Sequence, residues 1–229
     1  MRHPAPPASA AGSLSTPRAA ALAGIVFAVL LAAAIALVRI ALPDGASGAD
    51  VTIAPGRRGA LATALELVPF AGIAFLWFMG ALRENAGDAE DRFITTVFLG
   101  SGLIFVGALF AAVAAAGTVL DSDQSSQFGR HFAYTLLTTY AMRMAAVFVF
   151  ATSTIGRKLG VLPLPVALFG YAVGLVLLVA GSSFPWSEMV FPAWALIVSL
   201  CILSGRSGRS GRSGRSGASG ASEAPAASG

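Results

Sequence analysis

Long apolar stretches separated by short polar segments dominate the sequence. Six windows each hold about 20 mostly apolar residues, the length that an α-helix needs to cross a hydrocarbon core of about 30 Å. The windows are residues 19–42, 59–82, 93–120, 132–156, 163–181 and 186–204. Lipid offers no hydrogen-bond partner to exposed backbone, so such stretches cross membranes as helices. The pattern therefore predicts an all-α, polytopic transmembrane helix bundle with about six spans.

Both ends of the chain differ in composition from these windows. Residues 1–18 are rich in Pro, Ala and Ser, and residues 205–229 begin with a three-residue Arg-Ser-Gly repeat. Neither segment has enough apolar surface to build a core, so we expect two disordered tails around a transmembrane domain at 19–204. Ala46-Ser47-Gly48-Ala49 resembles a signal-peptide cleavage site. The apolar run before it is longer than a typical signal h-region, which favours a retained first helix.

The overall composition excludes an ordinary soluble domain. Hydrophobic residues make up 56% of the chain and charged residues 11%, and the mean hydropathy is +0.77. The formal net charge of +4 could suggest nucleic acid, but most of the basic residues flank apolar spans. We therefore predict no nucleic-acid partner. The expected partners are membrane lipids and either other membrane proteins or a second copy of the chain.

The distribution of Lys and Arg predicts the orientation in a cell membrane, because these residues resist translocation. With the N-terminus in the cytoplasm, ten basic residues lie inside and three outside. The inner set is Arg2, Arg18, Arg83, Arg92, Arg157, Lys158, Arg206, Arg209, Arg212 and Arg215, and the outer set is Arg57, Arg58 and Arg130. An even number of spans places both termini in the cytoplasm.

Small residues at four-residue spacing predict where helices approach one another. Gly24 and Ala28 begin such a stripe on the first helix, and Gly170 and Gly174 form a GxxxG motif on the fifth. A similar stripe on the third helix contains Ala112. We expect packing within the chain, with homodimerisation through Gly170 and Gly174 as the alternative.

Three charged residues lie inside apolar windows, where an ionisable group is costly unless it is paired, hydrated or close to the interface. Arg39, Glu66 and Arg143 all fall in the outer half of the predicted bilayer. They form either a polar cavity that binds an anion or relays a proton, or a structural pair between Glu66 and Arg143. Arg39 is expected to reach the outer headgroups, with pairing to Glu66 as the alternative. Glu188 is expected at the outer interface.

Known catalytic and cofactor motifs do not occur in the chain. The sequence lacks a phosphate-binding loop, a GxSxG elbow and an HExxH motif. It has two histidines, His3 and His131, and one cysteine, Cys201, so neither a metal site nor a cofactor is expected. We predict a non-enzymatic membrane component or assembly partner. The alternative is a small transporter or channel with a polar site at Glu66 and Arg143, and an intramembrane enzyme acting on lipid is the least favoured.

One region resembles a recurring pattern in multi-span membrane proteins of high-GC bacteria. The matching segments are FLWFMGALR at 75–83, EDRF at 90–93 and FLGSG at 98–102. The resemblance implies a bacterial inner-membrane location. It implies no activity and assigns no functional residue.

Overall fold

The computed structural model describes residues 16–41, 55–86, 92–121, 127–160, 162–179 and 186–216, and every regular element in these ranges is a helix. In chain order they are α1 (Thr16–Ala41), α2 (Pro55–Ala86), α3 (Arg92–Asp121), α4 (Gln127–Thr135), η2 (Leu136–Ala141), α5 (Met142–Lys158), α6 (Leu164–Val179), η3 (Ser187–Met189) and α7 (Val190–Ser216). The prediction of an all-α bundle is confirmed.

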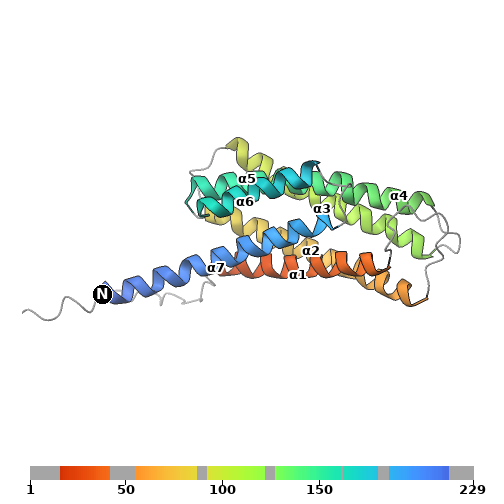
Figure 1. The fold of residues 1–229 in the computed structure, drawn as a ribbon, viewed down its shortest axis with the longest axis horizontal. Coiled ribbons are helices and arrows are strands. Elements are labelled where there is room, and N and C mark those ends of the chain that lie inside the picture. The colour runs from red at the N-terminus through yellow and green to blue at the C-terminus, as the bar shows by residue number, and fades with distance from the viewer. Residues whose placement is uncertain are drawn as a thin grey trace, which may run out of the picture.

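The helices form six rods that lie side by side, and successive rods run in opposite directions (Figure 1). The π-helix η2 joins α4 and α5 into one continuous rod. Around the bundle, α1 packs against α2 and α7, α3 packs against α2 and α5, and α6 packs against α5 and α7. We call the end at which α5 finishes the Lys158 end, and the end at which α4 begins the Gln127 end.

Five rods are long and apolar enough to cross a membrane. They comprise α1, α2, α3, the combined rod of α4, η2 and α5, and the first part of α7 together with η3. α6 is apolar but has only 16 residues, which corresponds to about 24 Å. These helices fit an integral membrane protein.

The bundle has different cross-sections at its two ends. Figure 1 shows that α6 and the start of α7 stop short of the Gln127 end, whereas α2, α3 and α4 reach it. The part of the bundle nearest that end is therefore built from α1, α2, α3 and α4. We call the level at which the bundle changes from six rods to four the step. Charged residues of the first and last helices meet at this level.

Phenylalanines hold the centre of the bundle together. Phe27, Phe75, Phe105 and Phe191 come from α1, α2, α3 and α7, and each is fully buried. The ring centroids of Phe27 and Phe75 lie 4.9 Å apart, and those of Phe105 and Phe191 lie 5.1 Å apart in an edge-on arrangement. Aromatic pairs at these distances contribute about 0.5–1.5 kcal/mol each beyond area burial. This cluster fixes the relative positions of four rods.

The last helix differs from its predicted end. α7 continues through nearly all of the Arg-Ser-Gly repeat, to Ser216, whereas we expected a disordered tail from Gly205. Once a helix is nucleated by its packed segment, each added residue gains one backbone hydrogen bond, which favours continuation. The tail segments at 1–15 and 217–229 and the cleavage-like site at 46–49 lie outside the described residues.

Candidate functional site

An ion pair links the first and last rods at the step. Nη2 of Arg39, in the last turn of α1, lies 2.7 Å from Oε2 of Glu188 in η3. The two side chains are only 19% and 5% exposed. Trp186, just before η3, has a left-handed backbone with φ 75°, an uncommon conformation for a residue with a side chain. This turn places Glu188 opposite Arg39.

The pairing corrects the expectation for both residues. The sequence predicted that Arg39 would extend to the headgroups or pair with Glu66, and that Glu188 would lie at the outer interface. Instead, each compensates the charge of the other across 149 positions of sequence. Removing one partner from such a pair leaves an uncompensated charge in a poorly hydrated place. The ion pair therefore stabilises the contact between α1 and η3 at the step.

A cavity of about 140 Å³ lies beside this ion pair. Its walls come from α1, α2, α3 and the rod of α4 and η2, and the lining is mainly apolar. Arg39, Glu188 and Arg130 line it as charged residues, together with the phenol-bearing Tyr134. The described lining thus contains two guanidinium groups and one carboxylate. It combines a large apolar surface with a few charged groups.

Alanines create the space for the cavity. Ala34 on α1, Ala64 on α2 and Ala112 on α3 all face it and are almost completely buried. The sequence interpreted Ala112 as part of a close-packing stripe. Here the short side chain leaves a volume that the neighbouring rods do not fill.

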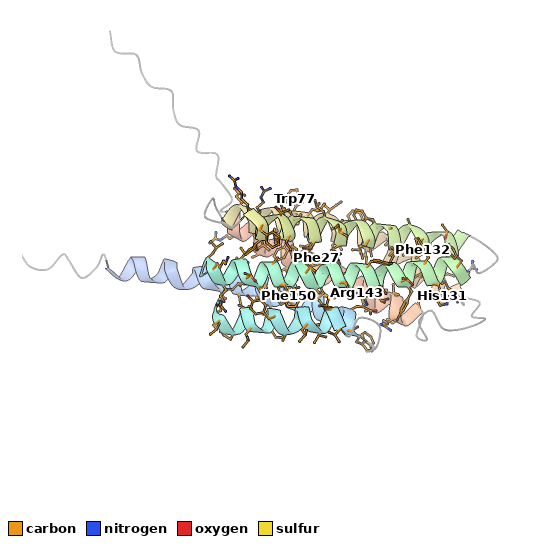
Figure 2. All side chains as sticks on the ribbon, turned by 90° about the horizontal axis from the view of Figure 1, so that it is seen from above. Phe27, Trp77, His131, Phe132, Arg143 and Phe150 are labelled. Carbon is orange, nitrogen blue, oxygen red and sulfur yellow. The ribbon has the colours of Figure 1, made fainter. Side chains whose placement is uncertain are left out.

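Glu66 and Arg143 do not line this cavity. Both side chains are exposed, and no ion pair joins them in the described part of the chain. The neighbouring Leu65 lines the cavity, so Glu66 projects from a different side of α2. Nη1 of Arg143, which is labelled in Figure 2, donates to the backbone oxygen of Thr139 at 3.1 Å on the surface of the bundle. The structure thus brings Arg39 to Glu188 and leaves the other two predicted residues apart.

The π-helix explains the direction in which Arg143 projects. In η2 the N–H of Met142 donates to the carbonyl of Leu137, five residues earlier. The wider turn accommodates one additional residue, which rotates everything after it by about 100° relative to an uninterrupted α-helix. The segment that forms η2 carries no sequence signal for a π-helix, so this turn was not predicted.

The predicted packing residues lie at helix contacts within the chain. Gly24 is buried against Ser199 and Phe78, and Ala28 is 3% exposed. Gly174 faces the ring of Phe150, at 2.9 Å from an added Cβ. The backbones approach closely at these positions because the side chains are minimal.

Gly170 lies against two buried polar groups. A Cβ at Gly170 would meet Ser153 Oγ and would lie 3.0 Å from Trp194 Nε1. Both polar atoms are fully buried and have no hydrogen-bond partner among the described residues. An unsatisfied buried donor costs about 1–3 kcal/mol, so the close approach of α5, α6 and α7 must offset this cost. The sequence offered no sign of this arrangement.

Comparison of the chain with protein families, with characterised proteins and with solved structures finds no match. The arguments about function therefore depend on the geometry of this chain.

Proposed function

We propose that the protein is a non-enzymatic membrane component that binds a lipid-like amphiphile in the cavity between α1, α2, α3 and α4. The observation that carries this proposal is the combination of an apolar lining with Arg39, Arg130 and Glu188 in one cavity. An amphiphile has the same combination, because it joins an apolar chain to a polar or anionic group.

The size of the cavity supports an apolar guest. An engineered apolar cavity of about 150 Å³ stays dry and binds benzene, so a space of about 140 Å³ can hold several methylene groups. Each methylene that leaves water for such a site contributes about 0.8 kcal/mol. The two guanidinium groups among the lining residues are hydrogen-bond donors, which suits a headgroup with acceptor oxygens.

The same features argue against an aqueous pathway through this region. An apolar wall offers no ligands to a dehydrated ion, and the guanidinium of Arg39 is already neutralised by Glu188. The alternative function, transport through a site at Glu66 and Arg143, finds no support in the cavity lining.

We further propose that the Lys158 end faces the cytoplasm. Arg18, Arg83, Arg92, Arg157 and Lys158 lie at or near that end, whereas Arg58 and Arg130 lie toward the other. This asymmetry follows the positive-inside rule. The test uses a Cys201→Ser background with single cysteines at Gly56 or Glu84, both exposed. In intact cells a membrane-impermeant maleimide should label the Gly56→Cys protein and spare the Glu84→Cys protein; the reverse result contradicts the orientation.

The cavity proposal is tested by filling the cavity. Ala112→Leu adds three carbons to the cavity wall, and Ala111→Leu makes the same change one residue away on the exposed side of α3. Lysophosphatidylglycerol, titrated into the purified full-length protein in neutral detergent, should raise the Tm of the wild type and of Ala111→Leu. For Ala112→Leu the concentration needed should rise at least tenfold. Equal responses of the three proteins would refute binding in the cavity.

A further inference from the structure

A second apolar depression lies on the outside of the bundle, along the seam between α1 and α2. This groove of about 670 Å³ begins at Arg18, extends past Val26 to Leu30 on α1, and is bordered on α2 by Phe70 and Trp77. It covers about 12 residues of α1, or about 18 Å of helix. Its position on the outer surface separates it from the cavity inside the bundle.

The groove has a floor of small side chains and walls of large ones. Ala19, Ala23 and Ala74 are among its lining residues. The larger Leu22 and Ile73 beside them are 64% and 52% exposed. Large exposed side chains next to alanines leave a trough that a flexible hydrocarbon chain can fill. The depression is therefore a consequence of side-chain size along two neighbouring helices.

The polarity of the groove changes along its length. Among the described residues that line the groove, Arg18 is the one charged side chain, and it lies near the start of α1 at the Lys158 end. Trp77 is 71% exposed on α2, two residues after Phe75, and Figure 2 shows it at about the level of Phe27, beside the apolar part of the groove. A guanidinium near a helix end is typical of the membrane interface. From Arg18 to Leu30 the groove thus changes from charged to wholly apolar, in the direction in which a lipid changes from headgroup to acyl chain.

We propose that this groove binds an acyl chain of an anionic phospholipid in the leaflet at the Lys158 end, with the phosphate at the guanidinium of Arg18. Charge complementarity selects the anionic headgroup, and the trough over Ala23 and Ala74 holds the chain. The groove does not depend on the amphiphile proposed for the inner cavity, because the two sites share no lining residue. A failure of one proposal therefore leaves the other standing.

The protein contains its own reporter for this site. The other two tryptophans are Trp194, which is fully buried, and Trp186, which lies just before η3, far from the Lys158 end of the bundle. In a Trp186→Phe background, brominated acyl chains should quench the fluorescence of Trp77 and leave that of Trp194 nearly unchanged. Quenching then measures the occupancy of the groove.

The full-length protein is reconstituted into vesicles that contain brominated phosphatidylglycerol or brominated phosphatidylcholine at equal mole fraction. We expect about fivefold stronger apparent binding of the anionic lipid, which corresponds to about 1 kcal/mol for one basic residue at the surface. Arg18→Gln should abolish the preference. Arg92→Gln removes an equal charge from an exposed residue at the same end, and should retain it. Equal quenching by the two lipids, or equal effects of the two substitutions, overturns the assignment to Arg18.

Further measurements distinguish a lipid in the groove from free phosphate and from a second copy of the chain. Ala23→Leu fills the trough and should lower quenching by both lipids. Ala111→Leu, on the exposed side of α3 and away from the groove, should not lower it. Inorganic phosphate at millimolar concentration should leave the quenching unchanged; a loss of the anionic preference would indicate a site for free phosphate instead. Weak quenching by every lipid that increases when the protein is diluted in the bilayer would mean that a second copy covers the groove, and would also overturn the proposal.

Discussion

Gly24 provides the sharpest test of the helix packing. A Cβ at this position would overlap Ser199 Oγ and would lie 2.7 and 2.8 Å from two ring carbons of Phe78. Ser199 and Phe78 are both completely buried, so neither has open space into which it can move. Gly24→Ala therefore forces α1 away from α2 and α7.

The expected cost follows from these contacts. Overpacking a close-packed core costs about 1–3 kcal/mol. Displacing Ser199 also threatens its 2.7 Å hydrogen bond to the carbonyl of Ala195, worth about 1 kcal/mol. Alanine recovers about 0.5–1 kcal/mol through its higher helix propensity. The sum predicts a destabilisation of about 1–3 kcal/mol and a Tm lowered by several degrees.

Gly107→Ala is the matched control. Gly107 is exposed on α3, and no heavy atom lies within 4 Å of an added Cβ. This variant should keep or slightly raise the Tm, because only the propensity term applies. Thermal unfolding of both variants in the same detergent, followed by tryptophan fluorescence, compares them. Equal shifts in Tm would refute the packing argument. Adding Ser199→Ala to Gly24→Ala should restore only part of the loss, because Phe78 still blocks the methyl group.

Three further outcomes are expected from thermal unfolding in detergent. In a double-mutant cycle, Arg39→Gln and Glu188→Gln should each cost about 3–5 kcal/mol and the pair less than the sum, since each charge is compensated by the other; additivity would contradict the ion pair. The corresponding cycle on Glu66→Gln and Arg143→Gln should be additive within about 0.5 kcal/mol, because the two exposed side chains do not meet, and a coupling above 1 kcal/mol would show that they do. A chain that stops after Ser204 should keep its Tm, because the buried residues described on α7 end at Ile202; a fall of several degrees would make the repeat structural.

The sequence was sufficient for the helices because their lengths follow from the membrane itself. Each predicted window coincides with one rod, and most rods extend past their window at one end or both: the window at 59–82 becomes α2 at Pro55–Ala86, whereas the window at 163–181 becomes the shorter α6 at Leu164–Val179. Apolar content marks the part of a helix that lies in lipid. It does not mark the helical turns that continue into the membrane interface, because charged residues can belong to a helix there.

The partners of the charges could not be predicted in the same way. Depth along a helix follows from residue number, but the direction of a side chain changes by about 100° per residue. Leu65 faces the cavity and Glu66 does not, so an uncertainty of one residue decides between the two environments. For Arg143 the π-helix η2 adds a rotation that no sequence signal recorded. Similar depth therefore did not imply contact.

The pairing of Arg39 with Glu188 depends on a feature that is visible only in three dimensions. α6 is too short to reach the Gln127 end, so α7 begins part-way along the bundle and brings Glu188 beside the last turn of α1. The same step leaves α1, α2, α3 and α4 around a space that alanines do not fill. The ion pair and the cavity are thus products of one geometric cause. Because Arg39 and Glu188 both line the cavity, a ligand that binds there lies beside the groups that join the first and last helices, and it stabilises the folded bundle by an amount that increases with the ratio of its free concentration to its Kd.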